Sequence, residues 1–164
     1  MIQVLLRKAT TDDLELMLAW RNSPLVWQGL YTQSKENRPL TWEEHHKWWN
    51  SRHNWKIFII QVNDTITTRD IGVVSFSQLD SWCPSVGIYI GEVSLWGKGI
   101  GKQGLLLALD WLKGEEYSAV WTTILSNNER SIKLFQSLGF QKVFQAREGE
   151  DTYILKLDNF KKGI

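Results

Sequence analysis

A glycine-rich run, Trp96-Gly97-Lys98-Gly99-Ile100-Gly101-Lys102-Gln103-Gly104, joins a predicted strand to a predicted helix and is the strongest local signal in the chain. Glycines at alternate positions leave the backbone of this turn unobstructed. The helix that follows directs its unpaired N–H groups and the positive end of its dipole at the same point. The run is therefore typical of a phosphate-binding turn, and a tight turn with glycines for packing is the structural alternative.

Two well-known phosphate loops do not fit this run. The Walker A loop needs Ser or Thr directly after Gly-Lys, but Gly101-Lys102 is followed by Gln103. A dinucleotide fingerprint fits Gly99, Gly101 and Gly104 in spacing. That fingerprint follows the first strand of a parallel unit, however, whereas three strands of antiparallel character precede this run. The sequence thus indicates a phosphate loop of another kind.

The periodicity of apolar residues predicts strands and helices on both sides of the run. Before it we expect strands at residues 3–7, 55–62, 71–76 and 86–92, and helices at residues 14–21 and 42–50. After it we expect a helix at 105–112, a strand at 119–125, a helix between Asn128 and Gly139, and a hairpin of 142–147 with 152–157. Residues 25–39 are polar and irregular and receive no element. We find no internal repeat or linker.

Length and composition restrict the class of protein. The chain has 164 residues, 43% hydrophobic and 23% charged, and a net charge of +1, so we expect one domain over residues 1–164. The near-neutral charge argues against coating of nucleic acid or of an anionic membrane. Cys83 is alone, no apolar run reaches about 18 residues, and the N-terminus has its basic residues after the apolar ones, unlike a signal peptide. We therefore expect a cytoplasmic location.

Two motifs resemble one known family. Residues 86–112, with the run Trp96 to Gly101, resemble the core of the GNAT superfamily of N-acetyltransferases, whose acetyl-coenzyme A (acetyl-CoA) loop reads [Gln/Arg]-x-x-Gly-x-[Gly/Ala]. Trp96 stands where Gln or Arg is usual, as in the branch of the ribosomal-protein acetyltransferases. Residues 128–135 followed by Leu138-Gly139-Phe140 resemble the family's next cofactor-binding helix. The resemblance implies an α+β fold: a central mixed, mostly antiparallel, splayed sheet of about seven strands flanked by about four helices.

The N-terminal third suggests an acceptor. Trp20-Arg21-Asn22, Tyr31-Thr32 and residues 41–45 resemble the aminosugar N-acetyltransferases of the pseudaminic-acid pathway, and ribosomal-protein and polyamine acetyltransferases share part of this pattern. The resemblance implies direct attack of a primary amine on the thioester of acetyl-CoA, with an amine on a nucleotide-linked aminosugar favoured. The alternatives are a protein N-terminus, a polyamine, and, in a different class, a non-catalytic acyl-CoA-binding sensor or a nucleotide-binding regulatory domain.

The resemblance also implies roles for residues at the cofactor site. The backbone of residues 89–93 is expected to follow the pantetheine arm, and the lysines of the loop are expected to add charge near the phosphates. The residues expected to bind the cofactor are Ile90, Val93, Trp96, Gly97, Lys98, Gly99, Ile100, Gly101, Lys102, Asn128 and Ser131. No metal site is expected.

For catalysis the candidates are Glu92 as base, His45 as an alternative base, and Tyr89 as a proton donor. Phe135 occupies a position where the family often has a tyrosine, so the usual general acid is missing. Neutralising a lysine at pH 7 costs about 4.6 kcal/mol and an α-amino group about 1.4 kcal/mol. Without an obvious His–carboxylate pair, we expect an amine of low pKa.

For the acceptor we expect a pocket formed by residues 20–32 and the helix at 41–50. Ten tryptophans serve either as core or as a wall for a flat or sugar-like ligand, and Arg21, Arg38 or Arg52 are candidates to pair with a diphosphate. The partner is a small-molecule amine or a peptide N-terminus, and exposed edge strands leave a homodimer open. The residues expected to bind the acceptor are Trp20, Arg21, Asn22, Tyr31, His46 and Trp49.

Overall fold

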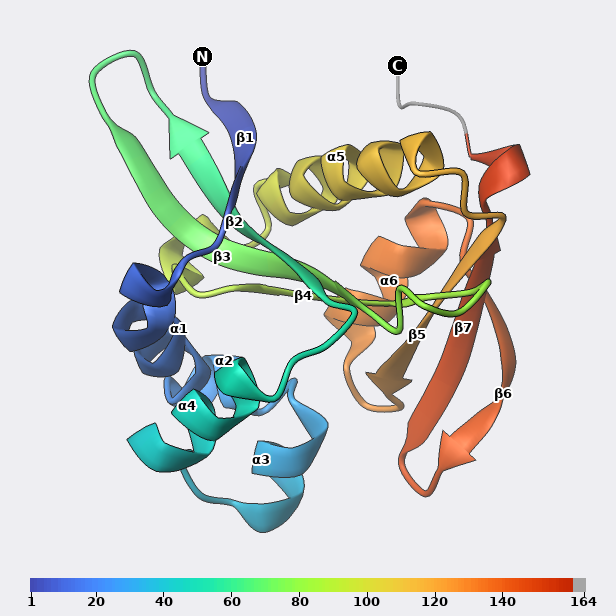
Figure 1. The fold of residues 1–164 in the computed structure, drawn as a ribbon, viewed down its shortest axis with the longest axis horizontal. Coiled ribbons are helices and arrows are strands. Elements are labelled where there is room, and N and C mark those ends of the chain that lie inside the picture. Colours follow the sequence, from blue (N-terminus) through green and yellow to red (C-terminus); the bar gives the residue numbers. More distant parts are fainter. Residues whose placement is uncertain (161–164) are drawn as a thin grey trace.

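The computed structural model describes residues 1–160, apart from the side chains of Thr32 and Asn159. Its centre is one seven-stranded sheet in the order β1-β2-β3-β4-β5-β7-β6 (Figure 1). All neighbours are antiparallel except β4 and β5, which confirms the expected mixed, mostly antiparallel sheet. The strands are β1 (Gln3–Lys8), β2 (Lys56–Asn63), β3 (Thr68–Ser77), β4 (Ser85–Ile90), β5 (Ala119–Leu125), β6 (Gln141–Arg147) and β7 (Glu150–Lys156).

The longest helices follow the sequence pattern. The helix expected at 42–50 is confirmed at both ends, because Thr41 and Glu44 form the capping box that fixes its first turn. The helix expected at 105–112 begins earlier, at Ile100, so the glycine-rich run already supplies its first turn. The described helices are α1 (Leu14–Arg21), α2 (Pro24–Trp27), α3 (Tyr31–Glu36), α4 (Trp42–Asn50), α5 (Ile100–Gly114) and α6 (Glu129–Ser137).

Residues 1–160 form six α-helices, where about four were expected. The two additional ones, α2 and α3, occupy the stretch that was expected to be irregular. Pro24 at the first position of α2 is compatible with a helix, since the missing N–H is unpaired there in any case. Asn37, with a φ of 50°, ends α3. Each helix is too short to show an apolar period in the sequence.

Helices cover both faces of the sheet (Figure 1). On one face α5 inserts Leu105, Leu109 and Leu112 into the main core, which also includes Phe135 of α6. On the other face α1 and α4 cover a smaller core in which Met17 and Trp20 of α1 contact apolar residues of β2 and β3.

The parallel pair β4 and β5 separates along its length. The strands meet at one pair of residues, Ser85 and Trp121, near the start of β4. Beyond this pair the strand edges that face each other diverge, while the other edge of β4 stays paired to β3 as far as Ile90. The expected splay is confirmed, and it leaves backbone N–H and C=O groups of both strands free to bind another group.

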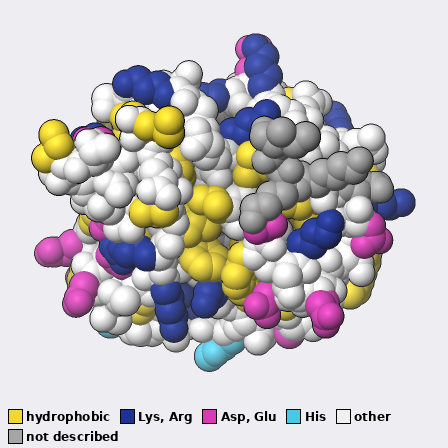
Figure 2. All heavy atoms as spheres, turned by 90° about the horizontal axis from the view of Figure 1, so that it is seen from above, with side chains coloured by type: hydrophobic (Ala, Val, Ile, Leu, Met, Phe, Trp, Pro, Cys, Tyr) yellow, Lys and Arg dark blue, Asp and Glu magenta, His cyan; other side chains and the backbone are white. Residues whose placement is uncertain are grey.

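A groove lies on the face that carries α5 and the start of β1. Figure 2 views this face from above and shows hydrophobic side chains gathered at its centre among charged ones. Ile2, Leu106 and Leu107 contribute to the groove between β1 and α5.

None of the helices in residues 1–160 combines the length and the apolar character that a membrane span requires.

Candidate active site

The glycine-rich run lines a cavity of about 360 Å³, which we call the loop cavity. Gly97 and Gly99 have φ of 75° and 76°, a region that residues with a side chain rarely adopt. Gly99 is the N-cap of α5, and the N–H groups of residues 100–102 precede the first helical hydrogen bond, from Gln103 to Gly99. The expected geometry of an anion-binding turn is therefore present. Of the residues expected here, the run contributes Trp96, Gly97, Gly99, Ile100, Gly101 and Lys102.

Trp96 anchors the run to the sheet. Its indole Nε1 donates a hydrogen bond of 2.8 Å to the carbonyl oxygen of Ile90, the last residue of β4. The guanidinium of Arg130 lies over the Trp96 ring, 3.4 Å from its centroid. Burial in this stack lowers the pKa of Arg130. Arg130 lines the loop cavity and was not among the expected cofactor residues, although it lies within the motif at 128–135.

A second cavity, of about 370 Å³, occupies the gap where β4 and β5 separate; we call it the splay cavity. Residues 86–89 of β4 form one side and residues 122–125 of β5 the other. The two cavities have six lining residues in common, so they meet at the gap. These shared residues are Gly29, Leu30, Ile88, Tyr89, Asn128 and Ser131.

Asn128 and Ser131 stand together at the junction because Asn128 caps α6. The Asn128 side-chain oxygen accepts a hydrogen bond from the backbone N–H of Ser131 at 3.3 Å. Gly29 approaches from the other half of the molecule so closely that a Cβ there would lie 3.0 Å from the Asn128 side-chain nitrogen. Gly29 and Leu30 lie in the stretch predicted to be irregular, and the sequence marked neither as a site residue.

Tyr89 lies at the junction of the two cavities. Its hydroxyl is buried and has no hydrogen-bond partner among the described residues. Burial raises the pKa of Tyr89, so the phenol stays protonated near pH 7 and keeps a proton to donate. The Tyr89 ring contacts Trp20 edge-on, with 6.5 Å between centroids. The Tyr89 hydroxyl is thus available to a group bound at the junction of the two cavities.

Three residues expected near the cofactor lie outside the lining. Glu92 follows β4 and its backbone N–H donates to the carbonyl oxygen of Ile71, but its side chain lines neither cavity. Val93 begins a 3-10 turn after it, and Lys98 is exposed at the tip of the run; neither lines the loop cavity. The chain turns away from the gap after Ile90, because Gly91 and Glu92 bond back to β3.

The two histidines of α4 do not lie at the cavities. His45 is fully buried, and its Nε2 lies 3.1 Å from the carbonyl oxygen of Leu14 in α1. Burial, followed by the charge of Arg21, lowers the pKa of His45 to about 4. His46 is exposed, and its side chain contacts those of Asn50 and Trp42. The structure therefore brings neither histidine to the cavities: His45 joins two helices, and His46 faces away.

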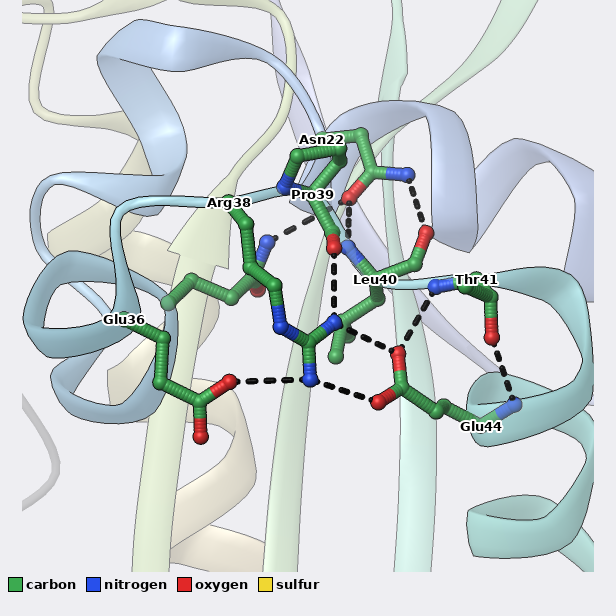
Figure 3. A network of polar contacts seen from close by, with 8 residues as sticks. Asn22, Glu36, Arg38, Pro39, Leu40, Thr41 and Glu44 are labelled. Carbon is green, nitrogen blue, oxygen red and sulfur yellow. Dashed lines mark hydrogen bonds and ion pairs between the residues drawn. The ribbon is translucent and has the colours of Figure 1, made fainter.

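Three further acceptor residues have structural positions. Figure 3 shows the Asn22 side chain bonded to the backbone of Leu40, with its nitrogen donating at 2.9 Å and its oxygen accepting at 2.8 Å. Trp20 is buried in the smaller core, and Trp49 stacks against Arg52, 3.5 Å from ring centroid to guanidinium carbon. None of the three lines either cavity, because each is already occupied with a contact that fixes α1 or α4.

Two of the residues proposed for the acceptor, Arg21 and Tyr31, line the splay cavity, together with residues that sequence reasoning missed. Glu150, at the start of β7, is nearly buried and accepts a hydrogen bond of 2.7 Å from Arg147. The Arg147 guanidinium in turn lies 3.2 Å from the centroid of the Tyr31 ring. Glu150 lies in the predicted closing hairpin, where its sequence context gave no sign of a site. The other missed residues of this wall are Gln33, Trp48 and Trp55.

The splayed, mostly antiparallel sheet is the fold expected for the GNAT class. A model of the acetyltransferase (GNAT) domain family matches residues 3–141, and the chain belongs to this family. The family expected from the two motifs is therefore confirmed.

An uncharacterized protein of Methanocaldococcus jannaschii is 46% identical over 155 residues. That match covers 94% of this chain but 31% of the relative, so the chain spans about a third of the relative's length. A crystal structure of a domain from the same organism superimposes with a TM-score of 0.91, at 45% identity, over 95% of this chain and 99% of that one. The spermidine N-acetyltransferase of Vibrio cholerae, solved with CoA and spermine, has a TM-score of 0.80 at 15% identity over 95% of this chain and 96% of that one, which shows the fold alone.

Proposed function

We propose that the protein transfers the acetyl group of acetyl-CoA, held in the loop cavity, to a primary amine held in the splay cavity. One observation carries the proposal: the two cavities have a common wall at the point where β4 and β5 separate. A thioester entering from one side and an amine entering from the other would meet there. Holding two reactants in this way removes much of the entropic barrier to their reaction.

The residues of the loop cavity fit acetyl-CoA. The positive-φ glycines and the first N–H groups of α5 form a cradle for a pyrophosphate, and Lys102 and Arg130 add positive charge beside it. The free edge of β4 offers backbone hydrogen-bonding groups to the amide-containing pantetheine arm. Acetyl-CoA supplies the activated acetyl group, and the chain's own residues bind and orient it.

Within the splay cavity, two side chains are suited to the proton movements. The Glu150 carboxylate, which accepts a hydrogen bond from Arg147, can hold the acceptor ammonium and accept its proton. The neutral amine then attacks the acetyl carbon, the C–S bond breaks, and the CoA thiolate leaves. The attacking nitrogen loses its second proton to the thiolate, which gives the amide and free CoA. Tyr89, which remains protonated, donates a hydrogen bond to the developing negative charge. Tyr89 thereby supplies a hydroxyl, which Phe135 lacks.

The acceptor we favour is an amine on a nucleotide-linked aminosugar. The aromatic faces of Tyr31, Trp48 and Trp55 in the cavity wall are suited to pack on a sugar or a base. A peptide N-terminus is the alternative within the same class of reaction, since its amine also has a low pKa. The ribosomal-protein and pseudaminic-pathway branches of the family correspond to these two acceptors.

The test is a thiol-release assay with acetyl-CoA and three acceptors: a nucleotide-linked aminosugar, a ribosomal-protein N-terminal peptide and a polyamine. Turnover with one class identifies the acceptor. We expect Glu150→Gln to lower kcat by about a hundredfold or more and Tyr89→Phe by about tenfold or more. Glu92→Gln is the matched control. Because Glu92 lines neither cavity, we expect the kcat of this variant to stay within about twofold of the wild-type value.

Each contrary result has a definite meaning. Loss of activity in Glu92→Gln with full activity in Glu150→Gln would return the role of base to Glu92. CoA binding without turnover on any acceptor would favour an acyl-CoA-binding sensor. Absence of CoA binding, measured by calorimetry, would overturn the assignment of the loop cavity.

A further inference from the structure

Three arginines near the acceptor side differ in what they contact. Arg38 forms ion pairs with Glu36 at 2.9 Å and Glu44 at 2.7 Å, as Figure 3 shows. Arg52 donates to the carbonyl oxygen of Trp49 and lies over two indole rings. Both lie outside the lining of the splay cavity. Arg21 is the arginine of the three that lines it.

The guanidinium of Arg21 forms no hydrogen bond or ion pair with any of the described residues. The guanidinium lies over the Trp48 ring, with 5.4 Å between its carbon and the ring centroid. Burial at the end of α1 lowers the pKa of Arg21, as expected for a cation without a nearby carboxylate. A guanidinium has five donors and is rarely buried without an acceptor for them, because the lost hydration is costly.

Two more polar atoms without partners lie in the same cavity. Among the described residues, three buried side-chain nitrogen or oxygen atoms lack a hydrogen-bond partner, and two of these belong to Gln33 and Tyr89, which line the splay cavity with Arg21. The Gln33 side-chain nitrogen is bonded to the backbone oxygen of Arg21, which leaves its own oxygen as a free acceptor. The splay cavity is thus lined by unpartnered donors, on Arg21 and Tyr89, and by an unpartnered acceptor, the side-chain oxygen of Gln33.

The charges of the cavity do not cancel. Its charged lining residues are Arg21, Arg147 and Glu150, and the last two pair with each other. Arg21 is left as an uncompensated positive charge. A polycation in this cavity would be repelled, whereas an anionic group would restore the balance and satisfy the guanidinium.

We infer that Arg21 binds an oxyanion carried by the acceptor, so that the substrate is an amine with a phosphate or a carboxylate group. This inference rests on the proposed function and narrows it. The free oxygen of Gln33 accepts a hydrogen bond from a hydroxyl or amine of the same molecule. Spermine-like acceptors are excluded, in contrast to the structurally similar spermidine N-acetyltransferase. A phosphate and a carboxylate can each offer two oxygens to the forked donors of a guanidinium, so the experiment must distinguish them.

The deciding measurement is anion binding. Inorganic phosphate and, separately, acetate are titrated at constant ionic strength into the protein with CoA present to fill the loop cavity, and tryptophan fluorescence is followed. We expect saturable binding of one of the two, weakened about tenfold or more in Arg21→Met and less in Arg21→Lys. Arg52→Met is the matched control, because Arg52 lies at the same 5.4 Å from the Trp48 ring but outside the cavity.

Turnover gives a second arm. Glucosamine 6-phosphate is compared with glucosamine, and an amino acid with its amide, in the thiol-release assay. We expect the anionic member of one pair to have a kcat/KM at least about tenfold higher, and Arg21→Met to abolish this preference. Which pair shows the preference identifies phosphate or carboxylate.

The results separate this inference from the function on which it rests. Equal anion affinity in wild type and Arg21→Met, or no saturable binding by the wild type, overturns the role of Arg21 whether or not acetyl transfer occurs. Anion binding that depends on Arg21, without transfer to any amine, supports the subsite and overturns the proposed reaction. The thermal midpoint of each variant checks that it is folded. If Arg21→Met does not fold, the comparison of Arg21→Lys with the wild type still tests the role of Arg21.

Discussion

A methyl group at Gly91 would overlap the indole ring of Trp20, which packs directly over this position. The overlap is with a rigid buried ring, so it can be relieved only by moving α1 or the end of β4. We expect Gly91→Ala to lower the free energy of unfolding by about 1–3 kcal/mol and Tm by several degrees, about 2–4 °C per kcal/mol.

The control for this residue is Gly114→Ala. A Cβ at Gly114 meets no atom within 4 Å, and Gly114 is the last residue of α5. Its Tm should be unchanged or slightly higher, since alanine favours the helix. Calorimetry decides between the two outcomes: an equal Tm for both variants would show that Trp20 has room to move.

His45 gives a prediction for pH. Its folded-state pKa of about 4 is below the ordinary value of 6.5, because burial and then Arg21 disfavour the charged form. Between these pH values the unfolded chain therefore binds more protons than the folded one, so stability is complete above pH 6.5 and falls as the pH decreases. We expect a loss of about 3 kcal/mol between pH 7 and pH 4 from this residue.

Urea unfolding from pH 7 to pH 4 measures this dependence. In His45→Gln the amide can still donate to Leu14, and the slope over this range should flatten. His46→Gln is the control on the exposed side of the same helix, and its curve should follow the wild type. A slope that survives in His45→Gln would assign the pH dependence to another group.

Single residues were the hardest to predict from sequence. Arg21 and Asn22 are neighbours in one motif, yet Arg21 lines the splay cavity and Asn22 is bonded to Leu40, eighteen positions away. Motif resemblance does not record which way a side chain points at the end of a helix. Glu150 was missed for a related reason: it reaches the cavity only because β7 pairs with the end of β5.

At the scale of elements, the link between β4 and α5 depends on Trp96. The indole bond to Ile90 fixes the run against the strand, and the stacked Arg130 closes its other side. In Trp96→Phe an aromatic ring remains for Arg130 to stack on, but the hydrogen bond to Ile90 is lost. We expect the Kd for CoA to rise about three- to tenfold and the stability to fall by about 1 kcal/mol.

Calorimetric titration of CoA measures this effect, with a thermal melt of each protein as its companion. Lys98→Ala is the comparison, since Lys98 lies at the exposed tip and lines neither cavity. An unchanged Kd for CoA in Trp96→Phe would show that the glycine backbone alone fixes the binding conformation of the run.

Elements were predictable where a local rule fixed their ends. The capping box of Thr41 and Glu44 gave α4 its correct limits, and β5 was correct at both ends. The helices α2 and α3 were missed because their contacts, such as the bond from Gln33 to Arg21, are to other parts of the chain. The early start of α5 was missed because glycine is a poor helix former in isolation.

At the scale of the whole molecule, the splay cavity lies between the N-terminal helices and the C-terminal hairpin. The splayed sheet that separates them was implied by the resemblance of two motifs to the GNAT family, and the structure confirms it. The two sides make contact where Arg147, the last residue of β6, stacks on Tyr31 of α3. This contact joins residues more than a hundred positions apart, and no local pattern in the sequence indicates it.

The stack of Tyr31 on Arg147 therefore holds the acceptor side of the cavity closed, and removing the ring should loosen it. We expect Tyr31→Ala to raise the KM for the amine about three- to tenfold, which corresponds to a cation–π contact of about 1 kcal/mol. The Kd for CoA should not change, because Tyr31 does not line the loop cavity. Tyr31→Phe keeps the ring and Arg147 keeps its bond to Glu150, so this variant should match the wild type. Equal losses in Tyr31→Ala and Tyr31→Phe would instead assign the effect to the hydroxyl, and a change in the Kd for CoA would show that the two cavities respond as one.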